Sequence, residues 1–241
     1  MVLFLKKCSS WLFSTSCALC HCATHTLHGL CLNCLQELPI LADCCRQCAK
    51  KLPTGQHGLI CGQCLQAPPP FDTTHALFSY QPPITKLMLN LKFNHAFSHA
   101  HLFGTLLAEK ITQEWYLNRS LPSVIIPIPL HPQRIKERGF NQVVEIARPI
   151  AKFTAIPINT RSCQRTHATL AQATLSAHER KHNIKNAFSI QGNFSGQHVA
   201  VMDDVITTGQ TITEFCRLLK KHGAKKIDVW CCAKAQILRD K

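Results

Sequence analysis

Residues 199–211 constrain the fold most, because they join an apolar run, two acids and a helix start. Residues 199–202 are all apolar, as in an inner strand of a parallel sheet. Residues 211–222 then repeat apolar side chains at helical spacing, and a second apolar run follows at residues 225–233. Strand, helix and strand in this order predict a βαβ unit, whose first strand-to-helix crossing is a place where such sheets bind ligands.

The acids and the loop at this crossing indicate a site for a phosphorylated ribose. Amides at a helix N-terminus and the threonine hydroxyls can donate to a phosphate, and Gly209 lets the phosphate approach the backbone. The carboxylates just before the loop can accept hydrogen bonds from ribose hydroxyls. The sequence contains neither GxxxxGK[ST] nor GxGxxG, which disfavours a P-loop or dinucleotide site. The expected binding residues are Asp203, Asp204, Thr207, Thr208, Gly209, Gln210 and Thr211.

Two acids followed by Thr-Thr-Gly-x-Thr resemble the 5-phosphoribosyl-1-pyrophosphate (PRPP) binding motif of type I phosphoribosyltransferases. The resemblance implies an α/β domain with the parallel-sheet type I phosphoribosyltransferase fold, which would bind PRPP together with Mg2+. It also makes Asp203 and Asp204 the candidate catalytic acids. The alternative interpretation is an ordinary acidic turn before a helix.

A basic segment follows another apolar run, at residues 124–130, and contains Arg134, Lys136 and Arg138. Guanidinium groups bind phosphate oxygens in paired, planar geometry, so Arg134 and Arg138 are candidates for the pyrophosphate side of the site. A solvated basic turn is the alternative. The surrounding string Pro-Ile-Pro-Leu-His-Pro-x-Arg-x-x-x-Arg-Gly-Phe-Asn-Gln is similar to the signature of the ComF (competence protein F) family.

The ComF resemblance extends over nearly the whole chain. Residues 165–188 are similar to the family's mobile segment, whose closure would bring Arg165 or Arg180 to the departing pyrophosphate. The resemblance implies cytoplasmic handling of single-stranded DNA during natural transformation, with DNA import and recombination proteins as further partners. Two alternatives remain: a phosphoribosyltransferase acting on a small-molecule acceptor, and a transferase remnant that serves protein interactions.

The N-terminal part contains four Cys-x2-Cys pairs, separated by ten, ten and twelve residues. Each pair can place two thiolates on one metal, and two pairs complete a closed tetrahedral zinc site, which is structural because no position is left for substrate. Cross-brace pairing, disulfides, and Cys22 or Cys44 as replacement ligands are the alternatives. The expected zinc ligands are Cys17, Cys20, Cys31 and Cys34 at the first site and Cys45, Cys48, Cys61 and Cys64 at the second.

The proline cluster at residues 67–70 predicts a boundary between a double zinc-ribbon-like module, residues 1–70, and a phosphoribosyltransferase-like domain, residues 71–241. In the second part, residues 71–80 predict a strand, and residues 82–93 and 97–114 predict helices. No segment predicts a membrane span. The first lysines follow rather than precede the opening apolar residues, which is the reverse of a secretory signal. Regular Cys-x2-Cys pairs together with a sugar-phosphate site favour a reducing cytosol, so a cytoplasmic location is expected.

The formal net charge is +14, of which residues 71–241 contribute +11. So basic a domain favours nucleic acid as a second partner. A solvated basic face is the alternative, and aromatic residues are scarce at 7%. Candidate DNA-binding residues are Lys220, Lys221, Lys225 and Lys226, with Trp115, Trp230 or Phe140 for base stacking if they are exposed.

Overall fold

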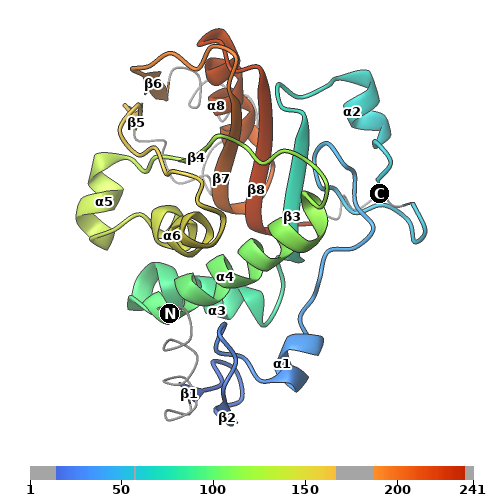
Figure 1. Ribbon diagram of the computed structural model, residues 1–241, viewed down its shortest axis with the longest axis vertical. Coiled ribbons are helices and arrows are strands. Elements are labelled where there is room, and N and C mark those ends of the chain that lie inside the picture. Colours follow the sequence, from blue (N-terminus) through green and yellow to red (C-terminus); the bar gives the residue numbers. More distant parts are fainter. Residues whose placement is uncertain (1–14, 57, 167–186, 237–241) are drawn as a thin grey trace, which may run out of the picture.

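A four-stranded parallel sheet in the order β3-β8-β7-β4 forms the centre of the computed structural model, which describes residues 15–56, 58–166 and 187–236 (Figure 1). Its strands are β3 (Thr73–Ser79), β4 (Val124–Pro127), β7 (His198–Ile206) and β8 (Lys226–Lys234). The inner strands β7 and β8 are covered on both faces, which explains their continuous apolar sequence. The predicted parallel α/β architecture is confirmed.

Helices cover both faces of this sheet (Figure 1). On one face lie α3 (Ile84–Asn94), α4 (Phe97–Lys110), the π-helix η2 (Ile111–Trp115) and α6 (Gln142–Thr154), and on the other lies α8 (Gln210–Lys221). Residues of β7 alternate between the two cores: Met202 packs with α4 and α6, whereas Val201 packs with α8. The expected helices are confirmed within a few residues. Trp230 is fully buried because β8 is an inner strand, so it does not meet the condition of exposure on which its candidacy for base stacking depended.

A close helix crossing fixes the position of α6. A Cβ added to Gly104 of α4 would lie 2.4 Å from the carbonyl oxygen of Ile146 in α6, so only glycine allows this approach. At its N-terminus α6 is capped by Asn141, whose Oδ1 accepts from the Val143 amide at 2.9 Å and whose Nδ2 donates to the Ile128 carbonyl at 3.1 Å. These contacts hold the start of α6 against the carboxyl end of β4.

The basic segment between β4 and α6 is a helix, α5 (Pro132–Arg138), rather than a turn. Pro132 occupies its first turn, and the amide of Gln133 donates to His131 Nδ1 at 3.3 Å. Gly139, with a φ of +80°, ends the helix. The helix presents its arginines and lysine together at one edge of the molecule.

The cysteine-bearing segments lie near the two ends of β3 (Figure 1). They contain β1 (Thr15–Ser16), β2 (Ala23–Thr24), α1 (Leu32–Gln36) and α2 (Gly62–Gln66). The chain between them runs beside β3: the Leu41 amide donates to the Leu77 carbonyl, and the Thr74 amide to the Arg46 carbonyl, both at 3.0 Å. The N-terminal segments are thus attached to the main sheet through its edge strand.

A short antiparallel pair, β5 (Cys163–Arg165) with β6 (Phe188–Ile190), flanks the predicted mobile segment. Residues 167–186 of that segment, which include Arg180, lie outside the described residues. Within the described part of the chain, the helices are all too short or too polar to cross a bilayer.

Candidate functional site

The loop between β7 and α8 has the geometry of an anion site. Thr207 and Thr208 are exposed, and Gly209 caps α8 with a φ of +78°, in the left-handed region that favours glycine. The first intrahelical bond runs from the Thr213 amide to the Gly209 carbonyl at 2.9 Å. Amides before this point have no acceptor within the helix, so they can donate to a bound phosphate.

Lys234, at the end of β8, is hydrogen-bonded to the backbone of this loop. Its ammonium donates to the Thr207 carbonyl at 2.5 Å and to the Ala235 carbonyl at 3.0 Å, and the residue is only 9% exposed. Burial lowers the pKa of Lys234. The sequence did not predict this role, because a lysine that ends a strand usually points into solvent. The pairing of β8 with β7 brings it under the loop.

Asp204 is buried and ion-paired. Its Oδ2 lies 2.5 Å from Lys92 Nζ of α3 and accepts from Gln142 Nε2 of α6 at 3.1 Å. Burial alone would raise the pKa of Asp204, but the Lys92 ammonium lowers it overall. Neither partner was predicted as a site residue, although Gln142 ends the string that carries the family resemblance. Asp204 therefore stays ionised and joins β7 to two helices.

Asp203 is the more accessible of the two acids. It is half-buried, and its Oδ1 accepts the amide of Asp204 at 2.9 Å. Burial and the neighbouring Asp204 charge raise the pKa of Asp203 to about 8. A cation bound beside it would favour the ionised form, so this carboxylate suits a site that receives a metal with its ligand.

Three arginines gather near the acids. Arg138 donates to Gln142 Oε1, and its guanidinium carbon lies 5.4 Å from the centroid of the Phe93 ring. Arg165 of β5 lies 5.4 Å from the Phe188 ring centroid. Burial lowers the pKa of both, and the positive charge of Arg134 lowers it further.

The negative charge of Asp203 raises the pKa of Arg165, as expected for two opposite charges near each other. Arg134 is 54% exposed in its side chain and lies 3.8 Å from Glu137. The fold thus brings Arg134, Arg138 and Arg165 to the edge of the sheet that carries both acids, while Arg180 lies outside the described residues. Such a concentration of like charge favours a polyanionic ligand.

The predicted lysine cluster lies at the opposite edge of the sheet, where β8 begins. Lys220 Nζ is 3.4 Å from Asp72 and donates to the Lys225 carbonyl at 2.9 Å, while Lys226 is 3.3 Å from Asp228. Acids of the protein therefore compensate two of the four lysines. The other two lysines, Lys221 and Lys225, are exposed.

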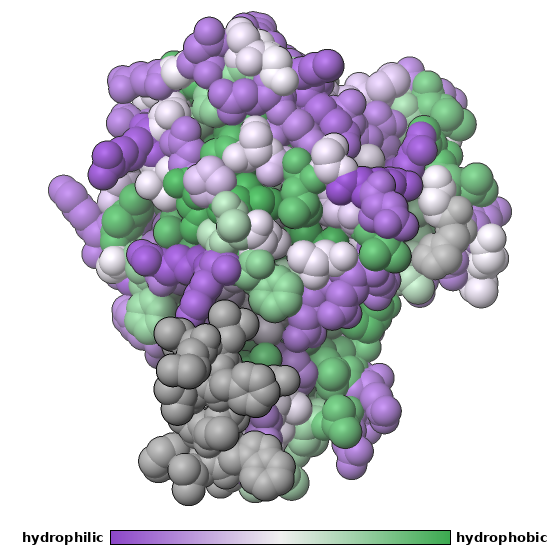
Figure 2. Space-filling view, viewed as in Figure 1, coloured by the Kyte–Doolittle hydropathy of each residue, from purple (hydrophilic) through white to green (hydrophobic). Residues whose placement is uncertain are grey.

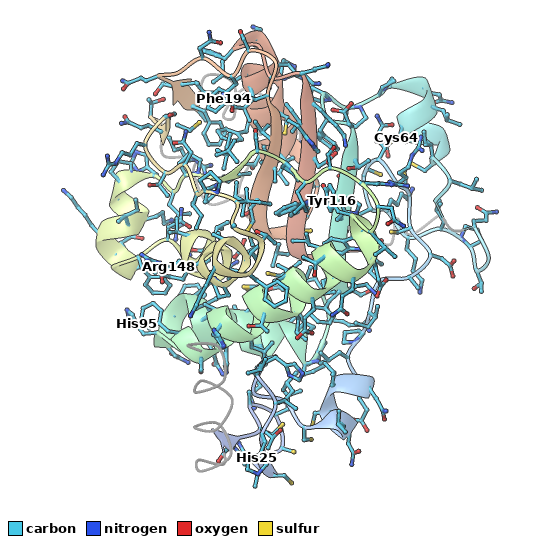
Figure 3. All side chains as sticks on the ribbon, in the orientation of Figure 1. His25, Cys64, His95, Tyr116, Arg148 and Phe194 are labelled. Carbon is cyan, nitrogen blue, oxygen red and sulfur yellow. The ribbon has the colours of Figure 1, made fainter. Side chains whose placement is uncertain are left out.

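The cysteines form two groups with the predicted sequential membership (Figure 3, near His25 and Cys64). All ligand atoms within a group lie within 4.8 Å of one another. A zinc–sulfur bond of about 2.3 Å in a regular tetrahedron sets sulfurs about 3.8 Å apart. The Sγ atoms of Cys20 and Cys31 are 3.6 Å apart, and those of Cys48 and Cys61 are 3.7 Å apart. Both groups therefore fit zinc, and cross-brace pairing is wrong.

The two cysteine groups repeat one backbone design. The amide of His21 donates to the Cys17 carbonyl at 3.0 Å, and the amide of Ala49 does the same to Cys45 at 2.8 Å. Both His21 and Ala49 have positive φ, at 61° and 56°. Cys22 lies in neither group, and every cysteine in the described ranges is a free thiol, which disfavours the disulfide alternative.

Comparisons with known proteins agree with this arrangement. Residues 140–240 match the model of the phosphoribosyl transferase domain, and residues 8–65 match that of the double zinc ribbon domain. The chain is 33% identical over 229 residues to competence protein F of Haemophilus influenzae, covering 92% of this chain and 98% of that protein. This chain belongs to the competence protein F family. Family membership and the two cysteine groups together support two structural zinc ions and a type I phosphoribosyltransferase fold.

Other members of the family have a different name. The chain is 36% identical over 220 residues to DNA utilization protein YhgH of Salmonella typhi, covering 89% of this chain and 95% of that protein. Among solved structures, a purine phosphoribosyltransferase from Pyrococcus horikoshii is 21% identical, with a TM-score of 0.35 over 56% of this chain and 73% of the other. That likeness is too low to add to the family assignment.

Proposed function

We propose that the chain binds PRPP with Mg2+ at the β7–α8 crossing. The 5-phosphate would accept from the amides and hydroxyls of residues 207–211, and Asp203 and Asp204 would face the ribose hydroxyls. One observation carries this proposal: an accessible carboxylate, Asp203, lies near the end of β7, just before the loop that leads into the N-terminus of α8, with three arginines nearby. The carboxylate can accept from ribose hydroxyls, the loop amides can donate to the phosphate, and the arginines can bind the pyrophosphate.

The arginines would bind the pyrophosphate. Arg138 is held by Gln142 and so is positioned before a ligand arrives, whereas Arg134 is exposed and paired at the surface with Glu137. Arg165, on the strand that leads into residues 167–186, would add charge when the site closes. The hard carboxylate oxygen of Asp203 would help to hold Mg2+, which when bound would supply positive charge to stabilise the leaving group.

The cellular role that we propose is cytoplasmic handling of single-stranded DNA during natural transformation, together with DNA import and recombination proteins. The names of the relatives, competence protein F and DNA utilization protein YhgH, support a role with DNA. The excess of basic residues supports it too. In this role PRPP is a substrate or a regulator of DNA handling.

A second candidate function is phosphoribosyl transfer to a small-molecule acceptor. The intact acids and the intact loop favour it, because a site kept only for protein contacts has no need of either. In that case Asp203, Asp204 and Arg165 would be the catalytic residues. A nucleophile would attack C1 of the ribose, and the arginines would stabilise the departing pyrophosphate.

Titration calorimetry tests the binding proposal. Wild type should bind PRPP saturably with Mg2+ and much more weakly in EDTA, and Asp203→Asn should lose most of the affinity. Glu114→Gln is a matched control, because Glu114 is a 57% exposed acid that pairs with Lys110 outside the site. Absence of binding by zinc-loaded wild type, or equal binding by Asp203→Asn, would contradict the proposal. Release of pyrophosphate on adding an acceptor would favour the enzyme.

A further inference from the structure

Four aromatic rings lie together at the surface beside the candidate site, three of them exposed and one, Phe140, half-buried. We call this group the aromatic platform: Phe93, His95, Phe97 and Phe140. The ring centroids of Phe97 and Phe140 are 4.7 Å apart, those of His95 and Phe140 are 5.5 Å apart, and those of His95 and Phe97 are 6.4 Å apart. Phe93 ends α3, His95 and Phe97 bracket the turn into α4, and Phe140 joins α5 to α6. His95, labelled in Figure 3, marks this flank of the molecule.

Two of the platform's three phenylalanines are exposed although their side chains are apolar. Phe93 is 61% exposed and Phe97 is 47% exposed, whereas phenylalanines of the sheet cores, such as Phe103, are fully buried. Apolar and hydrophilic residues are intermixed on this flank, where α3, α5 and α6 reach the surface (Figure 2). A group of large exposed rings is uncommon on a protein that binds nothing, so the platform points to a partner.

Cations border the platform. The Arg138 guanidinium lies 5.4 Å from the Phe93 ring centroid, and its backbone carbonyl is 3.2 Å from His95 Nε2. Arg134 and Lys136 of the same helix are exposed. Sites for single-stranded nucleic acids combine aromatic rings, which stack on the bases, with cations, which bind the phosphates.

We propose that the aromatic platform stacks bases of single-stranded DNA, while Arg134 and Lys136 of α5 contact its phosphates. The inference rests on the proposed DNA-handling function and assigns it a surface. A single strand fits better than a duplex, whose bases are already stacked inside. It also fits better than an apolar protein segment, which would gain nothing from the arginines. The lysines at the other end of the sheet are partly compensated by acids and fit a strand less well.

The aromatic platform is connected to the candidate sugar-phosphate site through shared residues. Arg138 contacts the platform through Phe93 and donates to Gln142, which in turn donates to Asp204. Lys92, the other partner of Asp204, directly precedes Phe93 in α3. A strand on the platform would therefore lie beside the sugar-phosphate site rather than at a remote surface.

Fluorescence anisotropy with a labelled oligothymidylate of about 20 nucleotides, longer than most single-strand sites, tests the proposal. Phe93→Ala and Phe97→Ala should each weaken binding about tenfold, since one stacked base contributes about that much. The control is Phe153→Ala, because Phe153 is a 58% exposed phenylalanine near the other end of α6, and it should bind as wild type does. All three side chains are exposed, so each variant should keep its fold and zinc content.

Salt dependence separates the two kinds of contact. The slope of log affinity against log salt should stay as in wild type for Phe93→Ala and Phe97→Ala, because stacking releases no counterions. Arg134→Ala should reduce the slope by about one. A reduced slope in the phenylalanine variants would overturn the stacking assignment.

The remaining outcomes distinguish the inference from the proposed function. If wild type fails to bind single-stranded DNA, both the inference and the DNA part of the proposed function are wrong. If wild type binds and the phenylalanine variants bind equally well, only the platform assignment is wrong. It is also wrong if these variants alter self-association in size-exclusion chromatography without changing DNA affinity. The same holds if the phenylalanine substitutions weaken binding of duplex DNA of equal length as much as they weaken binding of the single strand.

Discussion

Tyr116→Phe should destabilise the fold by breaking a buried polar network at the amino ends of the strands. The centre of that network is Asp228 of β8, which is 1% exposed. Its carboxylate accepts from Thr73 Oγ1 and from the Tyr116 hydroxyl, and it contacts His198 Nε2, all at 2.6 Å. The Tyr116 hydroxyl also accepts from Trp230 Nε1 at 3.1 Å. The network thus ties β3, β7 and β8 to the residue that follows η2.

The expected loss follows from these contacts. Removing the Tyr116 hydroxyl deletes one hydrogen bond to a charged acceptor, which contributes about 1.5 to 3 kcal/mol. It also leaves the buried Trp230 N–H without an acceptor, at a cost of about 1 kcal/mol or more. The ring itself remains, so packing changes little. We expect a total of about 3 kcal/mol for Tyr116→Phe and about half of that for Thr73→Val, which removes a hydroxyl that donates to the carboxylate and contacts His75.

Urea unfolding followed by tryptophan fluorescence, with zinc present throughout, measures both values. The dependence of unfolding free energy on urea should keep the wild-type slope, since neither change alters the surface exposed on unfolding. The reasoning is refuted if Tyr116→Phe costs no more than Thr73→Val. It is also refuted if both variants lie within about 0.5 kcal/mol of wild type, the usual range of surface substitutions.

Three further predictions concern other parts of the molecule. Burial lowers the pKa of His75 from 6.5 to about 4, so its contribution to stability is complete above pH 6.5 and is lost as pH falls toward 4. As pH falls from about 7.5 to 5, the free energy of unfolding in urea should therefore decrease by about 2 kcal/mol less for His75→Phe than for wild type. An equal decrease would contradict this. Elemental analysis should find two zinc ions per chain in wild type and in Cys22→Ser but one in Cys20→Ser; two in the last would exclude Cys20 as a ligand. Gly104→Ala should lower the thermal midpoint by several degrees, because its Cβ would meet the Ile146 carbonyl at 2.4 Å, and an unchanged midpoint would show that the helices can separate freely.

Local patterns made the strand-loop-helix segment and the cysteine groups predictable from sequence. The residues of the β7–α8 crossing are consecutive, so apolar period, acids and loop glycine could be read in one window. The Cys-x2-Cys pairs are likewise local, and their sequential pairing is the simplest one. Whether Trp230 is exposed could not be predicted from sequence, because the burial of a strand residue depends on which strands lie beside it.

The remaining features depend on contacts between distant residues. Lys92 is a helical lysine that reads as solvent-exposed, and only the docking of α3 beside β7 reveals its ion pair with Asp204. Tyr116 and Asp228 are 112 residues apart, and neither carries a motif. The aromatic platform combines residues from α3, α4 and the connections beside them, so the sequence pointed to only one of its members, Phe140. The proposed roles of Asp203, Arg134, Arg138 and Arg165 stay predictions that ligand binding must test.

A crystal structure of the chain with PRPP and Mg2+ tests the central claim most directly. We expect the 5-phosphate on the amides of residues 207–211, ribose hydroxyls within hydrogen-bond distance of Asp203, and pyrophosphate beside Arg134 and Arg138. PRPP bound elsewhere, or a site that stays empty at saturating ligand while both zinc ions are present, would contradict it.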